Sequence, residues 1–374
     1  MNRINGLLAA LILLSACGSA GVRQADRLPP VTTPPDRITL NVALLRESDY
    51  IDIVYENGAI SYAGYLKKED MREHPPAEPC RGESAAPSRT SKGIWIWDMR
   101  KIAGHEKSVT ERLAADGFNR LYVQIQRDPE TLVPLLKEAA QAGIEVFAVD
   151  GDPDHIINYQ PLIDDIMKIR RFNNLCRDAC FAGIQFDVEP YLRKDFNLRK
   201  QYYADRYLRM ARDLRQAAGP GLRLSFALPF WFDTLSAEGK PLSFQVTDIA
   251  DEVAIMSYRT DFDEMVQSAI QELCYAATAG KPVFLGLETT KLPDEEHVIL
   301  DAGKAMRDGA TSRGETLVIE TRKNDIRASR TYTVRAERLT FHGKKEELVR
   351  TLNRKPPFRS FSGYIVHSYE GLYE

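Results

Sequence analysis

One short segment, Phe181–Tyr191, combines an apolar strand with two carboxylates placed two residues apart. Its sequence is FAGIQFDVEPY, in which Gln185, Asp187 and Glu189 alternate with apolar residues. Alternate residues of a strand point to the same face, so these three polar side chains share one face. Polar groups on a buried strand are costly unless that face lines a site, and paired carboxylates suit general acid–base chemistry. The segment therefore predicts a catalytic site at the end of this strand.

Polar and aromatic side chains recur at the carboxyl ends of the other strands that the sequence predicts. A mouth lined by acids and aromatic rings suits a carbohydrate, because sugars offer hydroxyl groups to carboxylates and flat C–H faces to rings. A lone histidine or tryptophan also fits ordinary core packing, so His367 and Trp231 keep that second explanation. Besides the three residues above, we expect at this mouth Asp98, Gln124 or Gln126, Asp150, Asp152, Trp231, Asp233, Tyr258, Arg259, Glu288, His367 and Tyr369.

Eight strand-like apolar runs, separated by helical patterns, would position these residues. Strands that alternate with helices favour an α/β fold, here a (β/α)8 TIM barrel, and catalytic residues of such barrels lie at the carboxyl ends of the strands. An open doubly wound sheet is the alternative, but the sequence contains no glycine-rich phosphate loop. The expected strands are 93–97, 120–125, 145–149, 183–187, 222–228, 252–256, 282–287 and 362–366, and helical patterns include 129–142, 196–218 and 262–279.

Two further regions have strand patterns. Residues 38–68 alternate around Asn57-Gly58, a hairpin turn sequence, and predict a small β appendage. The connection between the seventh and eighth strands is too long for one helix, and its runs 315–321 and 331–339 alternate. We expect them to form a β-hairpin insertion over the barrel mouth, before a last helix near 344–352. The expected domains are therefore an appendage with linker, 38–91, and the barrel, 92–374.

The segment Phe181–Tyr191 resembles the fourth-strand signature of family 18 glycoside hydrolases, the chitinase-like TIM barrels. That signature places four acids as D-x-x-D-x-D-x-E. Asp187 and Glu189 match the last two acids, whereas Ala182 and Gln185 occupy the first two positions. The resemblance implies that Asp187 steadies the acetamido group of the substrate and that Glu189 is the acid.

A third point of resemblance and one competing arrangement concern other strands. Tyr258, in the run IMSY, resembles the tyrosine that follows the sixth strand in family 18. Retaining glycosidases of the large barrel clan instead place an acid after strand four and a nucleophile after strand seven, about 5–5.5 Å apart, which would use Glu189 and Glu288. Both plans describe hydrolysis of an envelope or extracellular polysaccharide.

A non-catalytic carbohydrate-binding or envelope-assembly protein is the alternative to an enzyme. It is favoured by the replacement of two acids of the signature by Ala182 and Gln185.

The amino-terminal segment is typical of an exported, lipid-anchored protein. Residues 1–17 have a basic start and an apolar run too short to span a bilayer. The run ends in Leu14–Cys17, which resembles the lipobox of bacterial lipoproteins and implies cleavage before Cys17 and lipid attachment there. Gly18 at the second mature position favours, by the same resemblance, the outer membrane, facing the periplasm or the exterior. The Pro-rich residues 18–37 would form a tether.

Composition excludes some functions. A net charge of -3 and a pI of about 6.2, without clustered basic residues, give no indication of nucleic-acid binding. No cofactor or metal is expected, since no histidine pair has ligand spacing. Disulfides are permitted in an exported protein, and the four cysteines after Cys17 can pair in three ways, all of which stay open. These cysteines are Cys80, Cys176, Cys180 and Cys274. A bridge between Cys176 and Cys180, which are close in sequence, would pin the loop before the strand that carries the two carboxylates.

Overall fold

The computed structural model describes residues 37–57, 59–71, 90–125, 128–308, 312–313, 316–320 and 328–373. The expected signal peptide and tether, Cys80 and Gln126 lie outside these residues. The chain divides into two compact units, which we describe separately. The β unit comprises the described residues of 1–75, 191–200 and 292–336, and the barrel unit comprises those of 76–190, 201–291 and 337–374.

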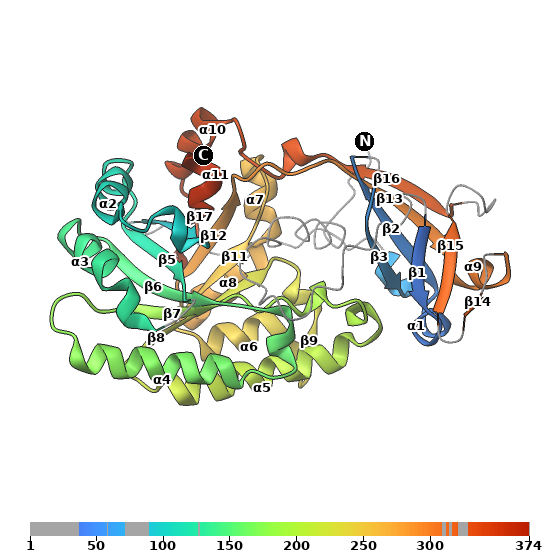
Figure 1. Ribbon diagram of the computed structural model, residues 1–374, viewed down its shortest axis with the longest axis horizontal. Coiled ribbons are helices and arrows are strands. Elements are labelled where there is room, and N and C mark those ends of the chain that lie inside the picture. The colour runs from blue at the N-terminus through green and yellow to red at the C-terminus, as the bar shows by residue number, and fades with distance from the viewer. Residues whose placement is uncertain are drawn as a thin grey trace. The chain divides into compact units, whose positions relative to one another are not determined.

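The barrel unit is built on eight strands that close into a parallel barrel, as the sequence predicted (Figure 1). Their order around the barrel is β11-β12-β17-β4-β5-β6-β7-β8, so the last strand closes against the first. The strands are β4 Ser91–Ile96, β5 Arg120–Gln124, β6 Glu145–Asp150, β7 Gly183–Phe186, β8 Arg223–Pro229, β11 Glu252–Met256, β12 Val283–Glu288 and β17 Phe361–His367.

Large side chains fill the barrel interior. Trp95, Tyr122, Phe147 and Phe284 come from four different strands and belong to one buried cluster. Their positions fix which residues of each strand point inward, because every second residue shares a face. The interior is a packed core, as in other barrels of this size, and a site can form only at an end.

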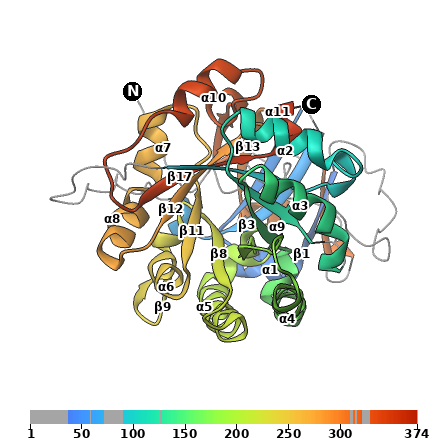
Figure 2. The same cartoon turned by 90° about the vertical axis from the view of Figure 1, so that its left-hand side faces the viewer.

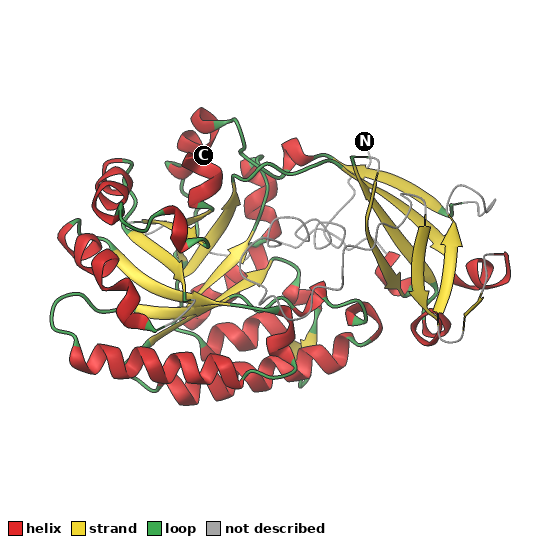
Figure 3. Cartoon of the chain, viewed as in Figure 1, coloured by secondary structure: helices red, strands yellow, loops and turns green. Residues whose placement is uncertain are grey.

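Helices cover the outside of the barrel (Figures 2 and 3). They are α2 Glu106–Ala115, α3 Val133–Gln141, α4 Gln160–Leu175, α5 Lys200–Ala218, α6 Leu242–Ile249, α7 Phe262–Ser268, α8 Ile270–Ala279, α10 Lys345–Leu352 and α11 Tyr369–Tyr373. Helix α8 ends at Gly280 in the left-handed conformation, φ 66°, which glycine adopts without strain. No helix of the described residues is both long and apolar enough to cross a membrane.

A disulfide joins Cys176 and Cys180, between α4 and β7. The bridge therefore ties down the loop that leads into the strand carrying the two carboxylates. Cys274, on α8, is also disulfide-bonded.

The β unit contains two small antiparallel sheets, of order β16-β13-β2-β3 and β1-β15-β14. The strands 50–56 and 59–66 form the expected hairpin. The insertion between strands seven and eight is rich in strands, but its expected hairpin is wrong: β15 pairs with β1 and β14, whereas β16 pairs with β13. The elements are β1 Arg37–Asn41, α1 Val42–Glu47, β2 Tyr50–Glu56, β3 Ala59–Leu66, β13 Glu295–Asp301, α9 Ala302–Asp308, β14 Ser312–Arg313, β15 Thr316–Glu320 and β16 Arg330–Val334.

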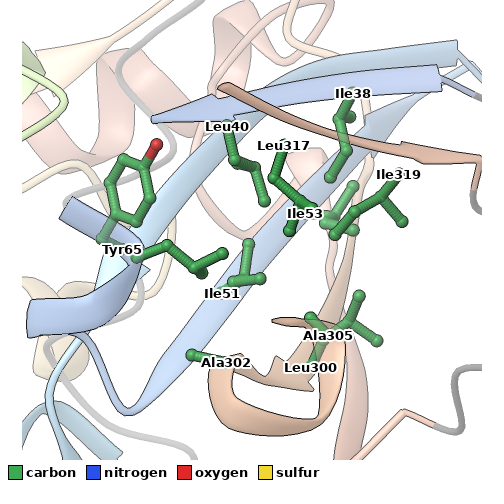
Figure 4. Close-up of a cluster of buried hydrophobic side chains, with 11 residues drawn as sticks. Ile38, Leu40, Ile51, Ile53, Tyr65, Leu300, Ala302, Ala305, Leu317 and Ile319 are labelled. Carbon is green, nitrogen blue, oxygen red and sulfur yellow. The ribbon is translucent and has the colours of Figure 1, made fainter. Parts of the chain in front are cut away.

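Apolar side chains from both ends of this unit's sequence form its core (Figure 4). Ile38 and Leu40 of β1 lie with Leu317 and Ile319 of β15, and Ile51 of β2 joins them. Burial of these groups against one another offsets the entropy of ordering the strands. The insertion therefore folds with the amino-terminal segment because the two share one core.

Candidate functional site

Two carboxylates follow strand β7 where the sequence predicted them. Gln185 lies inside the barrel, and Asp187 and Glu189 follow on the same face at its carboxyl end. Both acids are buried, with 8% and 4% of their surface exposed. Gly151 is required beside them, since a Cβ at this position would lie 1.9 Å from the backbone oxygen of Asp187. The backbone of Gly151, which follows β6, therefore packs directly against the backbone of Asp187.

Burial and mutual repulsion govern the protonation of this pair. Desolvation raises the pKa of Asp187 well above 3.8, and the nearby charge of Glu189 raises it further. The positive charge of His367 acts in the opposite direction. Two buried acids that repel each other's charge keep a proton at a pH where an exposed carboxyl has lost it. The pair therefore holds one proton more firmly than an exposed carboxyl does.

A second pair of functional groups, Glu288 and His367, lies at the carboxyl ends of β12 and β17. The two residues are register partners in adjacent strands, and Glu288 Oε2 lies 2.8 Å from His367 Nδ1. The other oxygen, Oε1, accepts hydrogen bonds from the backbone N–H and the hydroxyl of Thr290, at 2.6 and 2.7 Å. Glu288 is fully buried. Both of its carboxylate oxygens are therefore occupied within the protein.

The charge on the His367 ring is opposed by burial and favoured by its neighbours. Burial lowers the pKa of His367, whereas the Coulombic attraction and the hydrogen bond of Glu288 raise it. Asp187 and Glu370 add to the attraction, and the net result is a raised pKa. The imidazole is consequently held in its charged form more firmly than a free histidine.

Three aromatic rings surround His367. The ring centroids of Trp95, Trp97 and Tyr258 lie 6.1, 6.1 and 6.0 Å from the imidazole. Gly286 leaves room for the tyrosine, since a Cβ there would come within 3.3 Å of its Cε1 atom. The structure therefore places Asp187, Glu189, Tyr258, Glu288 and His367 at or just after the carboxyl ends of barrel strands.

Several buried polar atoms near the acid pair have no hydrogen-bond partner among the described residues. They are Asp187 Oδ1, Trp97 Nε1 and the hydroxyl of Tyr207, which lies on α5. The charges of Asp187 and Glu189, after burial, raise the pKa of this tyrosine well above 10. Buried polar groups in folded proteins are nearly always paired. Such atoms also occur away from the acid pair among the described residues, for example His155 Nδ1 and the hydroxyl of Tyr332.

Some predicted site residues are bonded elsewhere. Gln185 accepts a hydrogen bond from Trp95 Nε1 at 2.7 Å and donates to Ser225 Oγ at 2.9 Å, inside the barrel. Asp98 forms an ion pair with Arg100 at 2.7 Å and caps the short helix that follows β4. Their polar groups are thus satisfied within the protein.

Three others face structural neighbours. Asp150 interacts with Asp165 of α4, and burial followed by this acid raises its pKa to about 7. Val149 belongs to the interior cluster, so Asp150 points to the outside of the barrel. The side chain of Trp231 is buried, with its ring 5.1 Å from Phe232. Tyr369, the first residue of α11, is likewise buried, with its ring 5.0 Å from that of Tyr373.

Sequence reasoning missed Tyr207, Thr290 and Glu370. Tyr207 belongs to the buried stripe of an amphipathic helix, where an aromatic residue looks like ordinary core. Thr290 lies two residues after Glu288, and its hydroxyl donates a hydrogen bond to that carboxylate. A threonine at this spacing after a strand-end acid was the signal that could have identified the contact. Among the described residues, no group of three or more His, Cys, Asp or Glu side chains could hold a metal ion.

No family model and no curated protein matches this sequence. Among solved structures, the spore cortex-lytic enzyme SleL of Bacillus cereus is 12% identical, with 77% of this chain and 72% of that chain covered and a TM-score of 0.40. A chitinase from Bacteroides thetaiotaomicron is 10% identical, covering 76% and 91%, with a TM-score of 0.40. A class V chitinase from Pseudomonas fluorescens is 12% identical, covering 76% and 97%, with a TM-score of 0.39. This TIM barrel is thus distantly similar to glycoside hydrolases, and at such values the likeness carries no argument about activity.

Proposed function

We propose that this protein is a glycoside hydrolase that acts on a cell-envelope or extracellular polysaccharide, with Glu189 as the general acid. The supporting observation is the buried pair of Asp187 and Glu189 at the carboxyl end of β7, beside an ordered Glu288–His367 pair. A general acid must hold a proton to donate, and repulsion between two buried acids keeps one proton on the pair.

The role of Glu288 favours one of the two hydrolytic plans. A nucleophilic carboxylate must present a free oxygen to the anomeric carbon. Both oxygens of Glu288 are instead engaged by His367 and Thr290. In the substrate-assisted plan the acetamido oxygen of the sugar attacks the anomeric carbon, Asp187 steadies the acetamido group, and Glu189 protonates the leaving oxygen. We infer the substrate-assisted plan and a substrate with N-acetylated sugars.

A non-catalytic carbohydrate-binding or envelope-assembly role is the second candidate. One observation favours it: the position of a family acid is taken by Gln185, whose amide is committed to Trp95 and Ser225. Such a site could hold a sugar through its rings and acids without turning it over.

We also propose that the protein is anchored by lipid on Cys17, on the outer membrane. The support is the run Leu14–Cys17 after a short apolar segment. Wild-type protein should enter the detergent phase in a detergent partition, whereas the Cys17→Ser variant should not. Recovery of the wild type in the aqueous phase would refute the anchor.

The activity is tested on the full-length chain, purified in detergent, against a panel of polysaccharides that includes chitin oligosaccharides and peptidoglycan. Glu189→Gln keeps the side-chain size but removes the transferable proton, and it should lower turnover about a hundredfold or more with little change in binding. Glu111→Gln is the matched control, because this exposed acid makes only a long ion pair with Lys107, 3.9 Å apart. Wild-type turnover in Glu189→Gln would refute the acid. Binding without cleavage of any glycan would establish the second candidate.

A further inference from the structure

An arginine at the carboxyl end of the barrel lies over an aromatic ring. Arg259 is the third residue after β11, and its guanidinium carbon lies 5.1 Å from the centre of the ring of Phe230, the residue after β8. The last residues of these two neighbouring strands, Met256 and Pro229, are register partners. Arg259 and Phe230 therefore lie at the same end of the barrel as the acid pair that follows β7.

The contacts of Arg259 leave most of its hydrogen-bond donors available. Its Nη1 donates to the backbone carbonyl of Tyr258 at 2.7 Å, and among the described residues no other acceptor and no carboxylate at ion-pair distance contacts the guanidinium. A guanidinium carries five N–H donors in a planar fork. The side chain is half-buried, and burial lowers the pKa of Arg259 to about 10, so it is charged at neutral pH.

Other arginines that lie over phenylalanine rings in the barrel unit have acid partners. They are Arg120 with Glu252 at 2.8 Å, Arg223 with Glu145 at 2.7 Å and Arg354 with Asp263 at 3.8 Å. A charge that leaves water is costly unless an opposite charge or hydrogen bonds compensate it. Within the described barrel, Arg259 thus differs from these stacked arginines because its carboxylate partner is missing.

The acids closest to Arg259 in the sequence are engaged by other groups. Glu264 attracts the charge of Arg259 and Arg338 repels it. These two are paired with each other, since Nη2 of Arg338 lies 2.8 and 3.0 Å from the two carboxylate oxygens of Glu264. Asp261 caps α7, where its Oδ1 accepts a hydrogen bond from the backbone N–H of Glu264 at 2.9 Å. The guanidinium of Arg259 is therefore open to a carboxylate from outside the chain.

We propose that Arg259, lying over the ring of Phe230, binds a carboxylate carried by a sugar of the substrate, so that the substrate is an acidic glycan. This inference rests on the proposed function, which it narrows to one class of glycan. A guanidinium binds a carboxylate through two parallel hydrogen bonds, and an aromatic face beneath it holds the plane of the fork. A single cation matches a singly charged carboxylate better than a doubly charged phosphate.

The test compares two glycans that differ only in the carboxylate. Soluble, peptide-free oligosaccharides of peptidoglycan carry a lactyl carboxylate on alternate sugars, and reduction of this group to the alcohol gives the neutral form. Titration calorimetry near neutral pH uses the full-length protein in detergent with Glu189→Gln, so that neither form is cleaved. This protein should bind the acidic form about ten- to a hundredfold more tightly. Equal affinities, or no measurable binding of the acidic form, overturn the inference.

Variants in the same background assign the preference to Arg259. Arg259→Gln should lower the affinity for the acidic form about tenfold or more and leave that for the neutral form within about twofold. Arg259→Lys keeps the charge but not the fork, so it should lower the affinity for the acidic form alone and by less, and it serves if Arg259→Gln does not fold. Arg171→Gln, at an exposed arginine of α4, is the matched control and should change neither affinity. Equal losses for both forms would show that Arg259 only supports the backbone of Tyr258, which overturns the inference.

Three further outcomes separate this inference from its alternatives. Tighter binding of a phosphorylated glycan than of the carboxylated one would overturn the choice of a carboxylate. If the wild type cleaves neutral chitin oligosaccharides and Arg259→Gln shows no loss specific to the acidic form, the proposed hydrolase stands and this inference fails. If the acidic form binds through Arg259 but no glycan is cleaved, the proposed hydrolase fails and the carboxylate site stands.

Discussion

Raising the pH from 6.5 to about 9 should loosen the β unit, because a buried imidazole that holds two carboxylates titrates over this range. His297, on β13, is fully buried, with Nδ1 2.9 Å from Asp52 and Nε2 3.4 Å from Glu295. Tyr332 stacks on its ring at 4.4 Å. Burial opposes the charge, but the two carboxylates outweigh it and raise the pKa of His297 from 6.5 to about 9.

The size and sign of the effect follow from that shift. At about 1.4 kcal/mol per pKa unit, it corresponds to on the order of 3 kcal/mol of folding free energy. Because the folded pKa lies above the unfolded one, this stabilisation is complete below pH 6.5 and is lost as the pH rises through about 9. His297→Gln should destabilise the sheet by about 3–5 kcal/mol at pH 6.5, since it leaves Asp52 and Glu295 buried without their cation.

The two units can be followed separately. Hydrogen exchange measured by mass spectrometry, corrected for the intrinsic effect of pH, reports the strands of each unit separately. The protection of β2 and β13 in the β unit should fall up to about a hundredfold between pH 6.5 and about 9.5. The protection of β5 and β6 in the barrel unit should not show this fall.

The control is His342→Gln, which changes an exposed histidine of the barrel unit and should keep the wild-type pH dependence. If the protection of β13 is the same at both ends of this pH range, or if His297→Gln retains the wild-type dependence, the charge of His297 does not stabilise the sheet and the reasoning is refuted.

Two further predictions concern the barrel. Gly151→Ala places a Cβ 1.9 Å from the backbone oxygen of Asp187, so it should lower the free energy of unfolding by about 1–3 kcal/mol and shift the NMR signals of the site. Gly221→Ala, with open space around the added Cβ, is the control and should do neither. Equal thermal unfolding of the two variants would contradict this prediction. Asp150→Asn should stabilise the protein more at pH 8 than at pH 5. Burial and Asp165 raise the pKa of Asp150 in the folded protein from 3.8 to about 7, so its ionisation lowers the free energy of unfolding as the pH rises through that range. Urea unfolding at both pH values measures the difference, and an equal effect at both would refute the raised pKa.

The barrel strands could be predicted because each is a continuous apolar run with helical patterns on both sides. The predicted and observed bounds of β11, 252–256 and Glu252–Met256, coincide. The β unit was less accessible to such reasoning. Strand β15 pairs with β1, which lies far away in the sequence, and neither alternating pattern contains information about its partner. The hairpin expectation failed because two neighbouring strand patterns were assumed to pair locally.

Strand parity explains why some predicted site residues lie elsewhere. Asp150 and Asp98 were selected because they end or follow a strand. Val149 belongs to the interior cluster and Trp97 packs against it, and a residue one position away from an inward one faces outward. The structure was needed to show which residues of these strands face inward, and this parity places Asp150 and Asp98 on the outer face. The same rule retains Asp187, which lies two residues after the inward Gln185.

The pairing of Glu288 with His367 could not be predicted, although both residues were. Their contact joins residues 79 positions apart, and it depends on β12 and β17 being neighbours, with the whole insertion between them in the sequence. Once the barrel closes, register places the two side chains opposite each other at the same level of the mouth. Closure therefore brings the Glu288 carboxylate within 2.8 Å of the His367 imidazole. The composition of this end of the barrel comes from strand order as much as from residue type, because the two residues meet only when β12 and β17 are neighbours.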